Sequence, residues 1–114
     1  YDDPAGVTAA FNLNLLERIN RELGGDIPVE NFAHRAIWDD VHARIEMHLE
    51  ARRDLSVHWP GGVRAFRQGQ RIHTENSYKY ALTDFKALLA QAGFSRIQAW
   101  TDANNWFALC HAIA

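Results

Sequence analysis

The sequence predicts an α/β fold of the α+β kind, in which helices and antiparallel strands occupy separate stretches of the chain. Three observations predict it. Apolar residues recur every four positions over residues 4–23, alternate with polar residues over 44–52, and return to a helical period over about 79–92. Two further apolar runs then close the chain, which adds a terminal pair of strands to the prediction.

The first predicted element is an amphipathic helix over residues 4–23. Asp3 can cap its start, Pro4 suits the first helical position, and Gly24-Gly25 can end it. Its apolar residues fall four apart, so we expect them to form one stripe that packs on the core. This stripe consists of Val7, Phe11, Leu15, Ile19 and Leu23, and it is widened by Ala10 and Leu16.

The middle of the chain is predicted to form antiparallel strands. In "ARIEMHLEARR" apolar and polar residues alternate strictly, which is typical of a half-buried strand, although the same residues also suit a helix. The preceding "HRAIW" is its predicted partner, and "LSVHW" is a third strand that ends at Pro60. The stretch "VRAFRQGQRIHTE" is expected to hold one or two more strands.

A helix and a hairpin are predicted for the last third of the chain. The helical period over about 79–92 ends at Gly93. After it, "SRIQAWTD" and "WFALCHAIA" are separated by "ANN", a pattern that predicts an antiparallel hairpin.

Composition limits the classes of function. The 114 residues correspond to one domain or a large part of one, with ordinary globular values of 47% hydrophobic and 23% charged residues. A net charge of −2 and a pI of about 6.3 give no basic surface for nucleic acid or an anionic membrane, and no apolar run approaches the length of a membrane span. No protein partner is predicted.

The single Cys110 cannot form an internal disulfide, which favours a cytoplasmic location. Because the chain opens at Tyr1 without an initiator methionine, we expect it to be part of a longer protein.

No metal site or nucleophile is predicted. None of the six histidines forms an HExxH-type or CxxC-type pair, so we expect them to be surface residues. His42 and His48 would share one face of a strand, but no carboxylate or third histidine completes a known spacing. Cys110 lies in an apolar strand and is expected to be a buried structural thiol. Neither GxGxxG nor a P-loop is present, so the chain lacks those nucleotide cradles.

The stretch "RIHTENSYKY", residues 71–80, gathers many hydrogen-bonding side chains. In an extended segment Glu75 and Ser77 would face one side while Asn76 faces the other. An ionised carboxylate offers two acceptors and a hydroxyl offers a donor and an acceptor, so together they could hold a neutral imidazole ring. Alternatively, Asn76 or Ser77 caps the following helix. The residues by themselves leave both interpretations open.

Several separate motifs resemble the histidine Nα-methyltransferase family, which trimethylates the α-amine of histidine with S-adenosylmethionine in the ergothioneine pathway. They are "YDDPAGVTAAFNLNLLERINRELG", "RIEMHL", "TENSYKY", "LLAQAGF" and "WTDANNWFAL". The resemblance extends along essentially all 114 residues. It implies a Rossmann-like class I methyltransferase domain with an added substrate-binding domain. Residues 1–76 would be most of the added domain, and 77–114 the last helix and terminal hairpin of the methyltransferase sheet.

The resemblance also implies substrate-binding residues. Tyr1 matches a tyrosine that binds the amino-acid carboxylate, and Met47 matches a residue beside the imidazole. Glu75 and Ser77 match the pair that binds the imidazole, which favours the ligand-binding interpretation over the helix cap.

Other expectations concern residues without an assigned role. Asn12 and Asn14 also lie in a matching stretch, but we expect helix-surface or local hydrogen-bonding roles for them. No catalytic residue is assigned. The family's glycine-rich turn and its acidic ribose-binding residue have no counterpart here, so we expect this chain alone neither to bind S-adenosylmethionine nor to catalyse. Two alternative functions remain: a methyltransferase for another aromatic amino acid, such as a prenylated tryptophan, or a non-enzymatic small α+β domain.

Overall fold

The computed structural model describes residues 1–114, which form two compact units, Tyr1–Tyr78 and Lys79–Ala114. The chain has a mixed α/β architecture with two α-helices and three antiparallel sheets. None of its helices is both long enough and apolar enough to cross a membrane.

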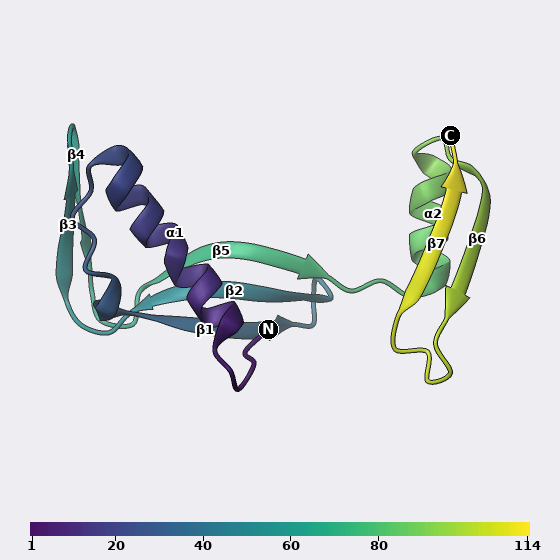
Figure 1. The fold of residues 1–114 in the computed structure, drawn as a ribbon, viewed down its shortest axis with the longest axis horizontal. Helices are drawn as coiled ribbons and strands as arrows, with labels where there is room; N and C mark the ends of the chain where they lie inside the picture. The colour runs from purple at the N-terminus through teal and green to yellow at the C-terminus, as the bar shows by residue number, and fades with distance from the viewer. The chain divides into compact units, whose positions relative to one another are not determined.

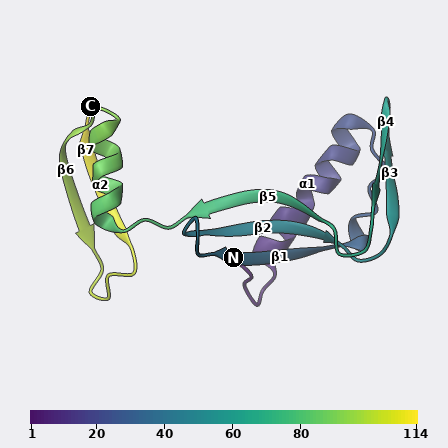
Figure 2. The same ribbon diagram turned by 180° about the vertical axis from the view of Figure 1, so that it is seen from behind.

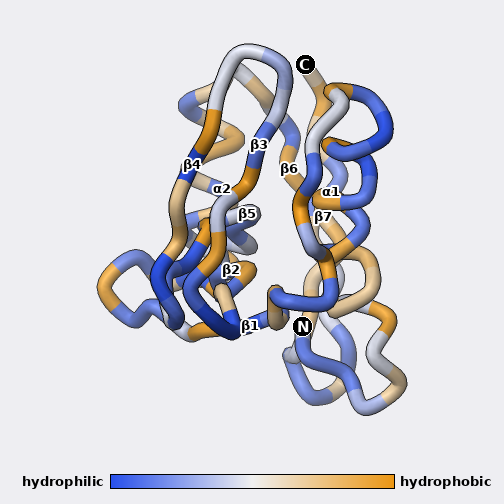
Figure 3. The backbone as a smooth tube through the Cα atoms, turned by 90° about the vertical axis from the view of Figure 1, so that its left-hand side faces the viewer, coloured by the Kyte–Doolittle hydropathy of each residue, from blue (hydrophilic) through white to orange (hydrophobic).

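The first unit is built on a three-stranded antiparallel sheet in the order β1-β2-β5. Its strands are β1 (Phe32–Asp39), β2 (Arg44–Ala51) and β5 (Arg71–Tyr78). The alternation of "RIEMHLEA" therefore belongs to a strand, as predicted, and its partner "HRAIW" lies within β1. Figure 3 colours the backbone by hydropathy, from blue for hydrophilic to orange for hydrophobic residues. Along β2, apolar Ile45, Met47, Leu49 and Ala51 alternate with polar residues. This alternation gives the sheet one apolar face and one polar face.

A second, two-stranded sheet completes the strands of the first unit. It pairs β3 (Leu55–Trp59) with β4 (Gly62–Phe66), so the third predicted strand is confirmed and the following stretch contributes two strands, β4 and β5. Asp26 connects this hairpin to the segment after the first helix, because its side chain accepts hydrogen bonds from the backbone N–H and the ring Nδ1 of His58.

Helix α1 (Val7–Leu23) lies across one face of the three-stranded sheet (Figures 1 and 2). It begins three residues later than predicted, so the placement of Pro4 at the first helical position is wrong. The reason is Gly6, whose positive φ of 73° interrupts the helical path before Val7. The helix ends at Gly24, as predicted, in a left-handed conformation with φ 68°.

The predicted apolar stripe of α1 is only partly buried. Its members Val7, Phe11, Leu15, Ile19 and Leu23 are exposed to between 38% and 68%. The buried residues of the helix are Leu16, which was predicted to widen the stripe, and Asn12, which was not predicted to be buried. Leu16 joins the hydrophobic core, which also contains Phe32, Leu49, Ala51, Val57 and Phe66. A short 3-10 helix (Val29–Asn31) leads from α1 into β1.

The second unit consists of α2 (Leu82–Gln91), β6 (Ser95–Thr101) and β7 (Ala108–Ile113). The strands pair antiparallel, so the predicted terminal hairpin is confirmed. Asp102 shapes the connection by accepting hydrogen bonds from the backbone N–H groups of Trp106 and Phe107. Helix α2 begins at Leu82 with Ala81 as its N-cap, so the interpretation of Asn76 or Ser77 as a helix cap is wrong. Pairing with β2 keeps both residues extended.

Candidate substrate-binding wall

Two of the predicted site residues lie on one face of β5. In the pairing with β2, Glu75 is opposite Met47 and Ser77 is opposite Ile45, and residues directly opposite in a sheet share a face. Asn76 lies opposite Glu46, on the other face, where its side-chain oxygen accepts a hydrogen bond from the His73 ring. Met47, Glu75 and Ser77 therefore belong to the face that α1 covers.

A β-bulge produces this arrangement. His48 pairs with His73 while the neighbouring Met47 pairs with Glu75, so Thr74 is an extra residue in β5. Thr74 Oγ1 lies 3.0 Å from the carbonyl oxygen of Met47 and 2.8 Å from Oδ1 of Asn12, to either of which it can donate its proton. Without an extra residue, strict alternation would place Ile72 and Ser77 on opposite faces. The bulge lets β5 supply a core residue and the predicted site residues to one face.

Tyr1 reaches the same face of the sheet from the other end of this unit's sequence. Its phenolic Oη lies 2.7 Å from Oγ of Ser77, 76 residues away in the chain. Met47 beneath them is only 4% exposed, whereas Tyr1 is 46% exposed. The structure thus gathers Tyr1, Met47, Glu75 and Ser77 from three segments at the β2–β5 edge of the sheet, and we refer to these four residues as the wall.

The hydrogen bond between Tyr1 and Ser77 has a chemical consequence. A ligand that uses Tyr1 for a carboxylate and Ser77 for a ring needs the two hydroxyls at different ends of itself. Such a ligand must break the Tyr1–Ser77 hydrogen bond and form new ones in its place. The exposed phenol of Tyr1 has more freedom to move than Ser77, which the β2–β5 ladder holds.

Asp3 anchors the segment that carries Tyr1. Its two carboxylate oxygens accept hydrogen bonds from the backbone N–H of Thr8, at 2.9 Å, and of Val7, at 3.0 Å. These N–H groups lower the pKa of Asp3 to about 2, because they stabilise its ionised form. Asp3 therefore caps the helix with its side chain, as predicted. The residue at the N-cap position itself is Gly6, because the helix begins at Val7 and not at Pro4.

Asn12 is the functional candidate that the sequence prediction misplaced. A helix-surface or local hydrogen-bonding role was expected, but Asn12 is 1% exposed and bonds to residues far away in sequence. Its Nδ2 donates to Nδ1 of His34 at 2.9 Å and to the carbonyl of His48 at 3.2 Å. His34 is 8% exposed, so the expectation that all histidines lie on the surface is also wrong. Asn14 is exposed, as expected.

A cluster of Glu46, His48 and His73 occupies the opposite face of the sheet from the wall. Sequence spacing predicted no carboxylate–histidine group, because His73 comes from a different strand; the signal was the pair Glu46-x-His48, which shares one face of β2. The expected sharing of that face by His42 is wrong, since His42 lies in the turn after β1 and bonds to Asp39 at 2.6 Å.

Both carboxylate oxygens of Glu46 in this cluster already have hydrogen-bond donors. Oε2 of Glu46 accepts a hydrogen bond from His48 at 2.8 Å, and Oε1 accepts one from Arg44 at 2.7 Å. These two donors lower the pKa of Glu46, the His48 hydrogen bond contributing most. The His48 and His73 rings stack with their centroids 4.5 Å apart and their planes at 24°. One ligand atom from each of Glu46, His48 and His73 lies within 4.8 Å of the other two, but Nε2 of His48 and Nε2 of His73 are hydrogen-bonded to Glu46 and Asn76.

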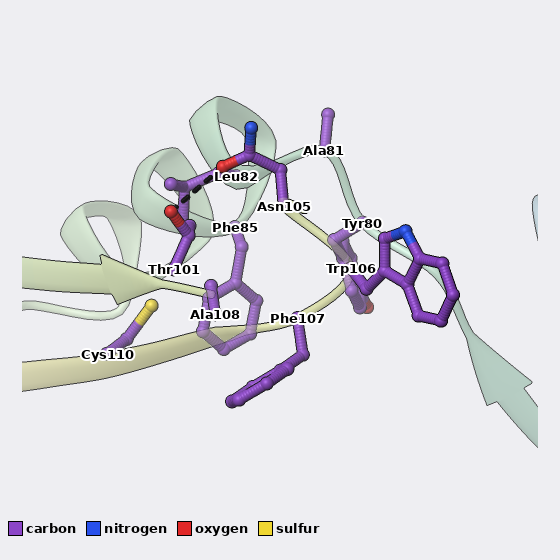
Figure 4. Close-up of a pocket in the computed structure, with 10 residues that line it drawn as sticks. All are labelled: Tyr80, Ala81, Leu82, Phe85, Thr101, Asn105, Trp106, Phe107, Ala108 and Cys110. Atoms are coloured by element: carbon purple, nitrogen blue, oxygen red, sulfur yellow. Dashed lines mark hydrogen bonds between the residues drawn. The ribbon is translucent and has the colours of Figure 1, made fainter. Parts of the chain in front are cut away.

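Cavities occur elsewhere in the chain. One cavity, of about 780 Å³, lies in the second unit and is lined mainly by aromatic and small side chains (Figure 4). A hydrogen bond between Thr101 and Asn105 crosses one side of it, and Cys110 lies along it, half-buried and not fully buried as expected. None of the four wall residues lines this cavity.

Comparison with known proteins agrees with the resemblance noted in the sequence. A family model described as "Histidine-specific methyltransferase, SAM-dependent" matches residues 1–114. The chain is 44% identical over 111 residues to histidine N-alpha-methyltransferase of Mycobacterium tuberculosis, covering 96% of this chain and 35% of that protein. It is 40% identical over 122 residues to the histidine N-alpha-methyltransferase of Mycolicibacterium smegmatis, covering 99% of this chain and 36% of the relative.

A more distant relative is ergothioneine biosynthesis protein 1 of Neurospora crassa. The two are 28% identical over 109 residues, covering 93% of this chain and 12% of that protein. The chain therefore spans about a third of the length of its two bacterial relatives. Because the family model matches every residue from Tyr1 to Ala114, the resemblance is confirmed: this chain belongs to the family of SAM-dependent, histidine-specific methyltransferases.

Proposed function

We propose that a longer protein containing this chain transfers methyl groups from S-adenosylmethionine to the α-amine of L-histidine, giving trimethylhistidine in the ergothioneine pathway. One observation carries the proposal. In a chain of the histidine-specific methyltransferase family, Tyr1, Met47, Glu75 and Ser77 come from three segments and meet on one face of one sheet. The single free Cys110 supports a cytoplasmic location for the reaction.

The proposal divides the chain between two parts of the parent protein. Residues 1–76 would be most of the substrate-binding domain, and 77–114 the last helix and terminal hairpin of a Rossmann-like class I methyltransferase sheet. The division of the chain into the compact units Tyr1–Tyr78 and Lys79–Ala114 supports a boundary close to this position.

The wall residues would bind and orient histidine. The carboxylate of Glu75 accepts a hydrogen bond from the imidazole N–H, and Ser77 donates one to the bare ring nitrogen. Met47 contacts the ring edge, and the phenol of Tyr1, after leaving Ser77, donates to the substrate carboxylate. Fixing the ring and the carboxylate leaves the α-amine pointing at the methyl donor, and that amine must be neutral because an ammonium has no lone pair. Glu75 would thus determine specificity and would not act as a base.

The residues of this chain lack the glycine-rich turn of dinucleotide-type cradles. The sequence contains no glycine-rich GxGxxG turn, and all its strand pairs are antiparallel, whereas the dinucleotide-type cradle joins a parallel strand to a helix through such a turn. The methyl donor would therefore be bound by other parts of the parent protein, and no catalytic residue is assigned here.

The proposal is tested with Glu75→Ala in the full-length protein. Removing the acceptor proposed for the imidazole N–H should cost about 1–3 kcal/mol, so KM for histidine should rise roughly 5- to 150-fold. The preference for histidine over other aromatic amino acids should shrink in parallel, as measured with a substrate panel.

Asn76→Ala is the matched control, because Asn76 is adjacent in sequence but lies on the other face of β5. It should leave the histidine KM within about twofold of the wild type. Unchanged histidine selectivity in Glu75→Ala would contradict the proposed role of Glu75. A wild-type preference for another aromatic amino acid in the same panel would identify a different substrate.

A further inference from the structure

The buried polar residues Asn12 and His34 have no role in the substrate contacts proposed above. They come from α1 and β1, are 1% and 8% exposed, and hydrogen-bond to each other at 2.9 Å. A buried polar pair is costly unless every group finds a partner, and apolar residues of similar shape can replace such a pair with little loss. The pair therefore calls for a reason beyond filling the space under the helix.

The hydrogen bonds fix the protonation of the His34 ring. Nδ2 of Asn12 is only a donor, so Nδ1 of His34 accepts from it and carries no proton. Nε2 of His34 lies 2.8 Å from the carbonyl oxygen of Tyr1, which is only an acceptor, so Nε2 carries the proton. His34 is consequently a neutral Nε2–H tautomer that receives one hydrogen bond from α1 and donates one to the segment before it.

The same network reaches both sides of the wall. Oδ1 of Asn12 lies 2.8 Å from Oγ1 of Thr74, the bulge residue that precedes Glu75. At the other end, the Tyr1 residue whose carbonyl His34 holds also places its phenol 2.7 Å from Ser77. Asn12 thus connects, through one amide, the strand that carries Glu75 and the segment that carries Tyr1.

We propose that Asn12 and His34 are positioning residues for histidine binding: they fix the backbone of Tyr1 and so aim its phenol at the ring-binding edge of β5. This inference rests on the function proposed above. Residues 1–3 have no regular secondary structure, and hydrogen bonds to other elements hold them, among them those of the Tyr1 carbonyl with His34, of the Tyr1 phenol with Ser77, and of Asp3 with the helix. Holding a substrate-binding side chain in place before binding lowers the entropy lost when the substrate binds.

Two substitutions of His34 in the full-length protein separate the two hydrogen bonds. Glutamine can place its amide nitrogen where Nε2 lies and keep the donor to the Tyr1 carbonyl, whereas asparagine ends near Nδ1 and cannot reach it. We expect His34→Asn to raise KM for histidine on the order of tenfold with kcat changed less, and His34→Gln to stay within about threefold of the wild type. Thermal unfolding of both variants checks that they fold.

Combining His34→Asn with Tyr1→Phe tests whether His34 acts through Tyr1. If it does, the two effects on KM are non-additive, because the aim of a phenol that has lost its hydroxyl no longer matters. Additive effects, or equal KM values for His34→Asn and His34→Gln, overturn the inference and leave the proposed function standing. If Tyr1→Phe alone leaves KM unchanged, the proposed substrate contact of Tyr1 fails, and the positioning role fails with it.

A measurement on the wild-type protein covers the case in which His34→Asn does not fold. Nitrogen-15 spectra of the His34 ring should show the neutral Nε2–H tautomer, with the proton hydrogen-bonded to a carbonyl. A proton on Nδ1 would reverse the direction of the network and overturn the inference.

Discussion

Asp3 shows how one side chain can bind the free N–H groups of a helix that begins four residues further along. Gly6 prevents α1 from extending back to Pro4, yet the carboxylate of Asp3 still meets the first free N–H groups of the helix, at Val7 and Thr8. This contact lowers the pKa of Asp3, because the hydrogen bonds are made to its ionised form.

The contribution of Asp3 to stability should therefore depend on pH. Because its pKa falls from 3.8 to about 2 on folding, the stabilisation is fully present above about pH 3.8 and is lost as the pH falls through about 2. Asp3→Ala should lower the thermal unfolding midpoint at pH 6, and the difference from the wild type should close between about pH 4 and pH 2.

Asp2→Ala is the control for this titration, because Asp2 is an exposed neighbour with no capping contact. It should leave the midpoint unchanged across the same pH range. A constant difference between Asp3→Ala and the wild type from pH 6 to pH 2 would show that the cap does not require the charge.

At the level of elements, α1 shows that periodicity predicts a helix better than it predicts the buried face. The apolar stripe is present, but of its residues only Leu16 is buried, together with Asn12 on the face that meets the sheet. Asn12 hydrogen-bonds there with three polar atoms, on His34, His48 and Thr74, that no apolar residue of the stripe could satisfy.

Leu16 and Leu15 are a matched pair for testing which face is buried. Leu16 is 2% exposed within the core and Leu15 is 39% exposed. Leu16→Ala should lower the free energy of unfolding of this chain by about 2–5 kcal/mol. Leu15→Ala should lower it by about 1 kcal/mol or less. Denaturant titration of the two variants measures both values, and a larger loss for Leu15→Ala would mean that Leu15, and not Leu16, contacts the sheet.

At the level of the whole molecule, the core is confined to one unit. Every buried hydrophobic residue of the chain lies between Leu16 and Phe66, within the unit Tyr1–Tyr78, and Lys79–Ala114 contains none. A segment of this size rarely builds a sufficient core by itself. This distribution agrees with a chain that spans about a third of the length of its bacterial relatives.

The isolated 114 residues should bind S-adenosylmethionine only weakly and non-specifically, and they should not methylate histidine. The physical reason is that they contain neither the glycine-rich turn nor a parallel strand to build the cradle. Isothermal titration with S-adenosylmethionine measures this directly, with the full-length protein as the positive control. Micromolar binding by the isolated chain would contradict the prediction.

The sequence by itself determined the local structure and the family. Alternation over "RIEMHLEA", the helical periods and the terminal hairpin are properties of neighbouring residues, so they could be predicted without knowing what lies opposite. The site prediction relied on the family resemblance for all four residues; period-two spacing placed Glu75 and Ser77 on one side but left the helix-cap interpretation open. The start of α1 was missed because the left-handed conformation of Gly6 is not visible in an apolar pattern.

Only the tertiary structure decided which residues meet. Side chains from different elements meet at the Thr74 bulge, in the Asn12–His34 pair and in the Glu46–His48–His73 cluster. The hydrogen-bond partners of Asn12, for example, lie 22 to 62 residues away in the sequence. The same holds for the 2.7 Å contact between Tyr1 and Ser77. Spacing along a strand or helix sets the direction of a side chain, but strand register and helix docking set its partner, and both depend on the burial of the chain as a whole.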